Sequence, residues 1–503
     1  MLAALLAVGP ARSIAAQTID TIIIENGNVF NGQDGAPAFV ARLANALHFK
    51  TRQWVIRRRL LLHPGDPFDA ARMEESERAL RSLGVFRAVR VDTTRLGSGG
   101  EEGGPLALRV VSADGWSSQP QASYTTAGGD ETWEVGFVER NFLGTATEVA
   151  VSYGRNPDRR RLDFAFVNPH FFGRRAHIEL RHGSYSDGRK SFWRFGMPFT
   201  ETAARRAVET YGESVRERVL RFREGVLTDS TSRRLLRVGL TGGFAPYATS
   251  RSYVRLWAGA EWRREDFGPA NVTPFPYTTF TTVRGGIELG KIRFRVLEHF
   301  NSFGRREDVD LSSTLRLGAV VQSGVGYEAR AQVAALWRRG FAVLRAEANG
   351  LDSTRARARL TVVSQVLPRH TVVVHLEGGT LYRPKPGAEF DLWMEQRGPR
   401  LFGIHDFTGT RMAWLVIEDR ILLTDAIWGL LAAGIAPFVD YGGAWFPADG
   451  TRMSGDVGLA LRVGPTRAVR GEAAELAVGY RFGDAVGEGG NRWGVTLRKS
   501  VMF

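Results

Sequence analysis

The feature that most constrains the fold of this 503-residue chain is a strict alternation of apolar and polar residues, clearest in residues 493–503. Successive side chains of a β-strand point to opposite faces, so this segment predicts one amphipathic strand with aromatic residues near both ends of its apolar face. Its length suits a membrane crossing, which favours a transmembrane β-barrel, whose last strand must pair with its first; a soluble sandwich is the alternative. The apolar face comprises Trp493, Val495, Leu497, Lys499, Val501 and Phe503.

The same alternation recurs from residue 116 onward, in short segments separated by Gly, Asn, Pro and Asp. No run of 18 or more apolar residues occurs, which excludes a helical membrane protein. About ten residues per strand, with long outer loops, predicts roughly sixteen strands. The long connection at about 201–233 is expected outside the membrane, or partly as strand extensions above it.

The two faces of these predicted strands differ in chemistry. In residues 161–166, Leu162, Phe164 and Phe166 share one face, and Arg161 and Asp163 share the other. Acids and bases both occupy the polar sets of such strands, so we expect a wet lumen with many ion pairs.

The first hundred residues have a different pattern, that of a small α+β unit. Asp69 is a suitable N-cap, and Gly84 a suitable stop, for the second of two predicted helices. In the first helix, Phe39, Leu43 and Leu47 recur at four-residue spacing. The predicted order is strand 19–24, helix 38–47, helix 70–83, strand 85–91 and strand 106–111, with an exposed loop at 97–104.

Residues 55–62, 64–69, 75–80 and 83–89 together resemble a POTRA (polypeptide-transport-associated) domain. The resemblance implies a periplasmic docking unit that binds client strands at an edge of its sheet, at 85–91 or 19–24. The predicted organisation is therefore a POTRA domain at 17–112 and an outer-membrane barrel at 113–503. Residues 1–16 are expected to be the remnant of a signal peptide, because a short apolar core precedes small residues there.

The net charge of +14 raises the question of nucleic-acid binding. Only five of the 67 basic residues are lysine, and the arginines are scattered among apolar residues within predicted strands. A charged lumen explains them more simply, so no nucleic-acid partner is expected. Cysteine is absent, which excludes disulfides and thiolate sites. No metal-site or nucleotide-site motif occurs, so no metal or cofactor is expected.

Two histidine–carboxylate pairs are candidate catalytic groups. His375 with Glu377, and His177 with Glu179, are same-face neighbours on predicted strands and could orient a base for a serine nucleophile. No nucleophile motif accompanies them, and polar pairs are common in barrel lumens. We therefore predict that the protein is not an enzyme.

The barrel segment resembles the BamA/TamA family of outer-membrane insertases and the related two-partner secretion transporters. Residues 137–147 match the family's second-strand turn, and 437–445 match the strand whose Asp440 and Gly442 face the lumen. Residues 398–409 and 414–420 occupy the places of the sixth loop and the next strand, which carries Glu418 and Arg420. The resemblance implies a lumen-directed loop and a seam between the first strand, about 119–126, and the last.

The sixth-loop motif departs from the family pattern. The matching residues are Leu401, Phe402, Gly403 and Ile404, so phenylalanine stands where the family has an arginine that reaches the acid found here as Asp440. Phenylalanine cannot donate hydrogen bonds to a carboxylate. Arg400 and Arg411 are the neighbours that could substitute.

The predicted function is assistance in inserting, assembling or translocating other proteins at the bacterial outer membrane, with the POTRA domain in the periplasm. Lipids surround the barrel, and the partners are unfolded clients or periplasmic proteins. Lys499, a charge on the outward face of the last strand, is expected to weaken the seam. The alternative is a passive pore or structural barrel without insertase activity.

Overall fold

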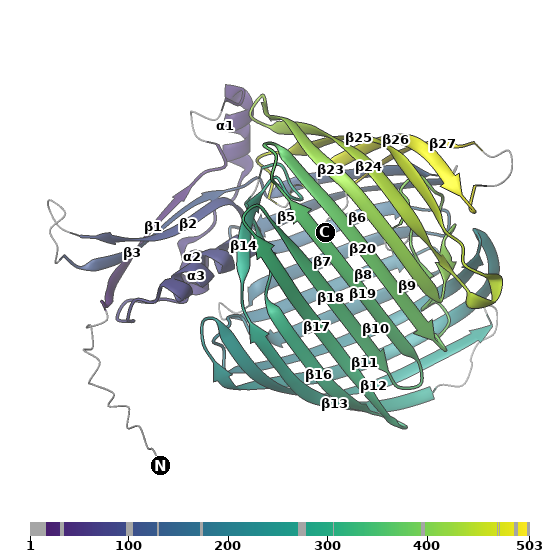
Figure 1. Cartoon of the computed structure of the whole chain (residues 1–503). Coiled ribbons are helices and arrows are strands. Elements are labelled where there is room, and N and C mark those ends of the chain that lie inside the picture. Colours follow the sequence, from purple (N-terminus) through teal and green to yellow (C-terminus); the bar gives the residue numbers. More distant parts are fainter. Residues whose placement is uncertain are drawn as a thin grey trace, which may run out of the picture.

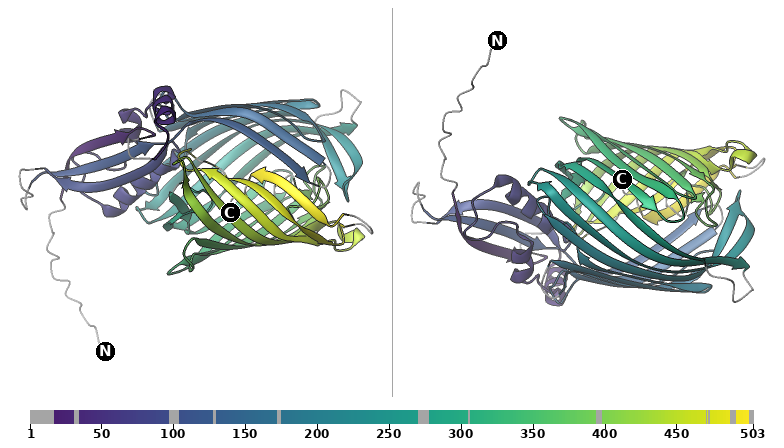
Figure 2. Two further views of the ribbon diagram at one scale, coloured as in Figure 1. Left: turned by 90° about the horizontal axis from the view of Figure 1, so that it is seen from above. Right: turned by 90° about the horizontal axis from the view of Figure 1, so that it is seen from below.

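A computed structural model describes residues 17–30, 35–96, 104–127, 130–171, 175–269, 278–304, 306–393, 398–469, 471, 473–486 and 491–499. The expected signal remnant, 1–16, lies outside these residues. Figure 1 shows a small α+β unit at one end of a large barrel, and Figure 2 shows the same arrangement from above and below.

The α+β unit is a three-stranded sheet in the order β1-β3-β2, with β1 parallel and β2 antiparallel to the central β3. Both β1 and β2 are therefore edge strands. The Asp69 carboxylate caps the last helix by accepting hydrogen bonds from Ala71 N and Arg72 N, as predicted. Residues 53–59, unassigned from the sequence, form a helix. The elements are β1 (Ile19–Gly27), α1 (Ala38–Leu47), α2 (Gln53–Arg59), α3 (Ala70–Ser82), β2 (Phe86–Arg95) and β3 (Leu106–Asp114).

The barrel is closed by twenty antiparallel strands, so the prediction of sixteen is wrong. In chain order, which is also their order around the barrel, they are β4 (Ser118–Ala127), β5 (Asp130–Phe142), β6 (Thr147–Arg155), β7 (Arg160–Phe171), β8 (Ala176–Tyr185), β9 (Gly188–Met197), β10 (Arg206–Arg223), β11 (Val226–Ala248), β12 (Ser252–Pro269), β13 (Thr278–Lys291), β16 (Ser313–Val321), β17 (Val325–Trp337), β18 (Gly340–Gly350), β19 (Thr354–Ser364), β20 (His370–Tyr382), β23 (Arg411–Ile427), β24 (Leu431–Trp445), β25 (Ser454–Pro465), β26 (Ala474–Gly483) and β27 (Trp493–Lys499).

The extra strands come from residues expected in loops. The segment at 201–233 forms most of the β10–β11 hairpin, whose strands of 18 and 23 residues are joined through Glu224 and Gly225 alone. Several other connections, such as those between β17, β18 and β19, are only two or three residues long. Alternation alone cannot distinguish a tight hairpin from one long strand with an outer loop, so the predicted number of strands is too low.

Two short hairpins lie outside the barrel wall. One is β14 (Phe294–Glu298) with β15 (Arg306–Asp310), between β13 and β16. The other is β21 (Phe390–Asp391) with β22 (Thr408–Gly409), within the long loop 383–410 between β20 and β23. A 3₁₀ turn, η1 (Pro447–Asp449), follows β24. Five barrel strands follow loop 383–410, the same number that follows the sixth outer loop of a sixteen-stranded barrel. The four strands beyond the expected sixteen therefore lie before this loop.

The barrel surface is apolar outside and polar inside. On β12, Leu256 and Trp262 are exposed, whereas Arg255 and Glu261 are buried. On β7, Leu162 and Phe164 are exposed, and Arg161 forms lumenal ion pairs with Glu134 and Asp163. The predicted face assignment is therefore correct. Nowhere in the described residues is a helix long and apolar enough to cross a membrane.

Cysteine labelling in intact cells tests the twenty-strand arrangement, because the chain has no native cysteine. Val208 of β10 is 44% exposed and lies between Met197 and Gly242 on the apolar outer surface. We expect Val208→Cys to resist a membrane-impermeant maleimide, since lipid covers it. Val226→Cys, at the hairpin tip, is the matched control and should react. Labelling of both positions would mean that 206–223 is an outer loop, as a sixteen-stranded barrel requires.

Candidate functional site: the lumenal loop, the seam and the POTRA joint

Loop 383–410 folds back into the barrel instead of extending away from it. Its apolar side chains form a buried cluster with the outer ends of β20, β23 and β24. The members are Leu381, Phe390, Leu392, Phe402, Phe407, Met412 and Ala444. This cluster holds the described parts of the loop, 383–393 and 398–410, in the lumen, where Arg400 and Leu401 reach the strands near the end of the chain.

Arg400 is the centre of the loop's polar contacts. Its Nε and Nη2 lie 2.6 and 3.0 Å from the two carboxylate oxygens of Asp440. Nη1 lies 3.0 Å from Glu475 Oε1, and Nη2 lies 2.9 Å from Glu418 Oε2. Each of these four side chains is at most 2% exposed. Arg400 thus joins β23, β24 and β26 through one guanidinium group.

The cluster is charge-balanced by two further arginines. Arg420 Nε donates to Glu418 at 2.6 Å, and Arg498 of β27 donates to Glu475 at 3.2 Å. Removal of one partner from such a buried ionic group leaves an uncompensated charge, which costs several kcal/mol. Guanidinium groups suit this role because their planar fork donates several hydrogen bonds at once.

Leu401 extends the contact to the remaining strands. Its backbone N donates to Asp456 of β25 at 2.8 Å, and its side chain packs on Ala436, Phe438, Ala460 and Ala477. It also lies against Gly494 of β27, where an added Cβ would be 3.0 Å from Leu401 Cβ. The pair Arg400 and Leu401 therefore contacts all five strands that follow the loop.

The other predicted loop residues have less direct roles. Phe402 packs on Phe407 at 5.2 Å between ring centroids, Gly403 N donates to Asp406, and Ile404 is buried. Phe402 thus fills the apolar cluster, and the neighbouring Arg400 contacts Asp440. Arg411, the other candidate, is exposed at the outer end of β23.

The predicted lumenal residues on β23 and β24 face this loop. Glu418, Arg420 and Asp440 are buried in the ionic cluster described above. Gly442 follows on the same face of β24, where a Cβ would lie 2.5 Å from Trp414 Cβ, so no side chain fits there. Sequence reasoning missed Asp456 and Glu475, although both are acids at lumen-facing positions of neighbouring strands.

The seam between β27 and β4 closes the barrel. At seven residues, β27 is the shortest described barrel strand. Trp493, Val495 and Leu497 are exposed on the outer face, and Thr496 is buried inside. The backbone of Lys499 ends the strand opposite Ala474, whereas its side chain and all of Val501 and Phe503 lie outside the described parts.

At the periplasmic base of the seam, hydrogen bonds join the segment before β4 to the β25–β26 connection without involving β27. Trp116 N, in the segment before β4, donates to Arg467 O at 2.9 Å in the β25–β26 connection, and Val469 N donates to Trp116 O at 3.1 Å. The Gln119 side chain adds a bond to Val469 O at 2.6 Å. These bonds hold the base independently of β27.

The β14–β15 hairpin and the residues between its strands occupy the periplasmic mouth of the lumen. Phe300 packs in a buried cluster with lumen-facing residues of β18, β19 and β20, and Phe303 packs on Leu422 and Ala432. Phe300 O accepts a hydrogen bond from Arg420 Nη1 at 2.7 Å. The hairpin therefore touches the same arginine that completes the Arg400 cluster.

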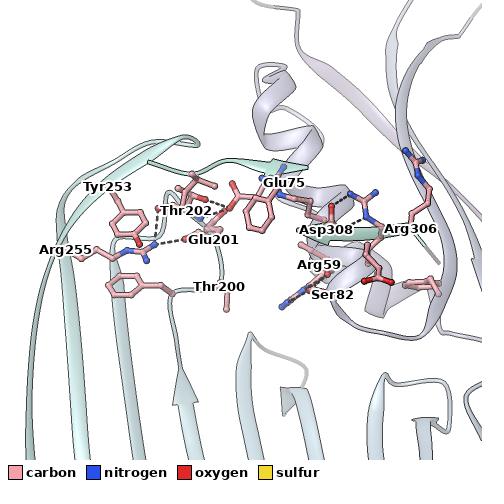
Figure 3. A pocket seen from close by; sticks show the side chains of 18 of the residues that line it. Arg59, Glu75, Ser82, Thr200, Glu201, Thr202, Tyr253, Arg255, Arg306 and Asp308 are labelled. Carbon is pink, nitrogen blue, oxygen red and sulfur yellow. Dashed lines mark hydrogen bonds and ion pairs between the residues drawn. The ribbon is translucent and has the colours of Figure 1, made fainter. Parts of the chain in front are cut away.

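Helix α3 of the N-terminal α+β unit holds this hairpin through two contacts. Arg81 forms a bidentate pair with Asp308, at 2.6 and 2.7 Å, and the Arg78 guanidinium lies 4.7 Å from the Phe294 ring centroid. Figure 3 shows the adjoining cavity of about 530 Å³, lined by Arg59, Glu75, Ser82, Thr200, Glu201, Thr202, Tyr253, Arg255, Arg306 and Asp308 among others.

A second contact across this cavity joins the domain to the barrel wall. Glu75 accepts from Thr202 N and Oγ1 at 2.6 and 2.7 Å, and Arg255 Nη2 donates to Glu201 O and Thr202 O (Figure 3). These buried bonds fix the orientation of the POTRA domain on the barrel.

The outer mouth is covered by the tip of the β10–β11 hairpin. The Phe222 ring stacks on His405 of the loop at 3.6 Å, and Gly225 N donates to His405 O. His405 bridges Asp391 and Asp158, the latter at 3.1 Å. Burial alone would lower the pKa of His405, but its hydrogen bonds to Asp158 and Asp391 raise the pKa to about 9.

Both candidate catalytic histidines, His375 and His177, belong to polar networks. His375 lies 2.8 Å from Thr361 Oγ1 and 3.4 Å from Glu377, which also binds Arg357 and Trp414. His177 is 3.8 Å from Glu179, a carboxylate shared with Arg181 and Arg194. Among the described residues, no group of three or more His, Cys, Asp or Glu side chains could hold a metal ion.

Comparison with known proteins identifies the N-terminal unit. The POTRA family model (Surface antigen variable number repeat) matches residues 47–110. Comparison of the sequence with curated proteins gives no match.

Among solved structures, CdiB from Acinetobacter baumannii is 11% identical over 96% of this chain and 74% of its own, with a TM-score of 0.48. CdiB from Escherichia coli is 10% identical over 99% and 93%, with a TM-score of 0.47. BamA from Haemophilus ducreyi is 10% identical over 96% and 85%, with a TM-score of 0.38. Similarity at this level adds nothing about function.

The protein is a bacterial outer-membrane β-barrel with one POTRA domain, which lies in the periplasm. The family match covers the N-terminal unit, and the twenty-stranded barrel follows it in the chain.

The Arg400 cluster predicts a large loss of stability when its centre is removed. Arg400→Ala leaves Glu418, Asp440 and Glu475 with too little positive charge, which should cost about 3–5 kcal/mol. The measurement is urea unfolding of the purified barrel in detergent. Arg400→Lys should recover only part of the loss, because lysine lacks the planar fork. Exposed Arg411→Ala is the control and should change stability by less than about 0.5 kcal/mol; equal effects of both alanine variants would contradict the assignment.

The His405 contacts predict a pH-dependent outer cap. Because the folded pKa of about 9 exceeds the usual value of 6.5, the contribution of His405 is complete below pH 6.5 and disappears as pH rises through about 9. Proteolysis of loop 383–410 in detergent, with an enzyme active across this range, should therefore accelerate between pH 7 and pH 9.5. His405→Gln should be cleaved readily and with little pH dependence. A wild-type rate that is flat over this interval would contradict the prediction.

Proposed function

We propose that this chain is an Omp85-type protein, one of the outer-membrane transport barrels that carry POTRA domains. It assists the insertion, assembly or translocation of other proteins at the outer membrane, through a seam controlled by loop 383–410. The observation that carries the proposal is the reach of Arg400 and Leu401 across all five strands up to the seam. A strand edge exposed in lipid carries unpaired amides that cost several kcal/mol each, so an opened β27 or β4 would recruit a client strand.

A continuous set of contacts supports coupling between the POTRA domain and this seam. Helix α3 holds the β14–β15 hairpin through Arg81 and Asp308, and the hairpin meets Arg420 at Phe300 O. From there the ion-pair chain runs through Arg420, Glu418, Arg400, Glu475 and Arg498, the last of which belongs to β27. We propose that a client strand added to the edge strand β1 or β2 shifts α3 and so loosens the seam.

The alternative of a passive pore is less well supported. Apolar clusters lie at both mouths of the lumen, around Phe390 and Phe402 at the outer mouth and around Phe300 and Phe303 at the periplasmic mouth. A passive pore has no use for this ordered loop and hairpin. The weakening role of Lys499 and the specific placement in the BamA/TamA family stay proposals from the sequence.

A reversible cross-link tests the proposed control of the seam. In Leu401→Cys/Gly494→Cys the two Cβ atoms start about 3.0 Å apart, so a small loop shift gives disulfide geometry. Oxidation should link the loop covalently to β27. In a strain depleted of the wild-type protein, the oxidised variant should then fail to support the assembly of other outer-membrane proteins. A reductant should restore assembly. The measurement is the folded fraction of those outer-membrane proteins, read from their heat-modifiable mobility in gel electrophoresis.

Each single-cysteine variant is the matched control and should be indifferent to oxidant. Normal assembly by the oxidised double variant would contradict control by the loop. Normal assembly in the depleted strain, together with a steady large conductance of the purified protein, would overturn the proposed function and favour a pore.

A further inference from the structure

Helix α1 exposes its large apolar side chains and buries its small ones. Phe39, Leu43 and Leu47 are 67%, 56% and 63% exposed, at four-residue spacing along one side of the helix. The opposite side packs through Ala41 and Ala44 in a small cluster, whose other members are Val29, Phe30, Ala36, Trp116 and Leu430. A helix docked on a soluble domain normally turns its large apolar residues inward.

This orientation of α1 is fixed by polar contacts at its inner side. The Asn45 amide bonds Phe30 twice, accepting from N at 3.1 Å and donating to O at 3.0 Å. At the end of the helix, His48 Nε2 lies 2.8 Å from the buried Asp114 carboxylate. Rolling the helix to cover Leu43 would break all three contacts, so the exposed stripe needs a partner from outside.

The stripe continues the barrel's lipid-facing surface. Figure 1 places α1 at the periplasmic rim of the barrel. On one side, Leu430 of its packing cluster is two residues from Trp428, which is 71% exposed in the β23–β24 turn. On the other side, the backbone O of exposed Phe49 accepts a hydrogen bond from the Asn141 side chain near the end of β5. The next two residues, Phe142 at the end of β5 and Leu143 in the β5–β6 turn, are also exposed.

The contact with the β5–β6 turn is close and geometrically demanding. Arg52 N donates to Gly144 O at 2.9 Å. Gly144 has a φ of +73°, and a Cβ there would lie 2.4 Å from Lys50 O. The apolar stripe and the rim of the barrel therefore form one fixed surface.

The charges beside the stripe are basic. Arg42, Lys50 and Arg52 are exposed, and α1 has no acidic residue in its sequence. An apolar helix face bordered by cations is the pattern of a helix that lies in the interface of a membrane with anionic headgroups. Most of α1, residues 38–46, also precedes the segment that matches the POTRA family.

We propose that α1 is an in-plane membrane anchor. Phe39, Leu43, Leu47 and Phe49 insert into the periplasmic leaflet of the outer membrane, and Arg42, Lys50 and Arg52 contact anionic phospholipid headgroups. The anchor holds the POTRA domain at the rim, beside Trp116 and the base of the seam. It stands independently of the proposed function, because a pore would present the same helix.

Site-specific fluorescence in lipid tests the anchor on the full chain. Leu43→Cys, labelled with an environment-sensitive dye and reconstituted in vesicles of zwitterionic lipid with anionic phosphatidylglycerol, should show a blue-shifted spectrum that acyl-chain doxyl lipids quench. Leu96→Cys, which is 38% exposed at the far end of β2, is the control and should be neither shifted nor quenched. Omitting phosphatidylglycerol should reduce the quenching at position 43.

Three results would overturn the proposal. Equal quenching at positions 43 and 96 would show that lipid does not cover the stripe. A blue shift that appears only as protein density per vesicle rises, without doxyl quenching, would assign the stripe to a second copy of the chain. A shift that requires added unfolded outer-membrane protein would assign it to a client. Urea unfolding of both labelled variants checks that each is folded.

Discussion

The structure depends on one buried cation. Arg400 lies among three carboxylates that belong to three different strands, and all four side chains are closed to solvent. Such a group is weak evidence for extra stability, because desolvation offsets the attraction. Its directional hydrogen bonds nevertheless define where this part of the loop lies. In the conformation that the structure shows, Arg400 pairs with all three carboxylates, and Leu401 contacts Gly494 of the last strand.

The proposed control of the seam needs only the strands that follow the loop. The four additional strands lie before the loop, so the five strands between the loop and the seam are unaffected. The ion-pair chain ends on Arg498 of β27, and its other end reaches the β14–β15 hairpin that POTRA helix α3 holds. The base bonds of Trp116 are separate from this chain, which confines any opening to the part of the seam above them.

Local pattern was enough to predict the POTRA elements other than helix α2, the Asp69 cap and the alternate faces of the barrel strands, because each depends on neighbours in sequence. The strand count failed because a tight turn at Glu224 and Gly225 leaves no signal that outweighs the alternation around it. Arg400 could be named only as an alternative, since its partners Glu418, Asp440 and Glu475 are brought together by strand register. The direction of Phe39, Leu43 and Leu47 likewise depends on contacts of Asn45 and His48, which no helical period reveals.

The most direct test of the central claim is the width of the seam itself. Spin labels at Val495→Cys of β27 and Ala122→Cys of β4, both on the outer face, report the separation of the two strands by pulsed electron paramagnetic resonance. The wild-type chain in lipid should give one short distance. With Arg400→Ala in the same doubly labelled chain, a second and longer distance should appear. An unchanged single distance in that variant would show that the buried arginine does not control the seam.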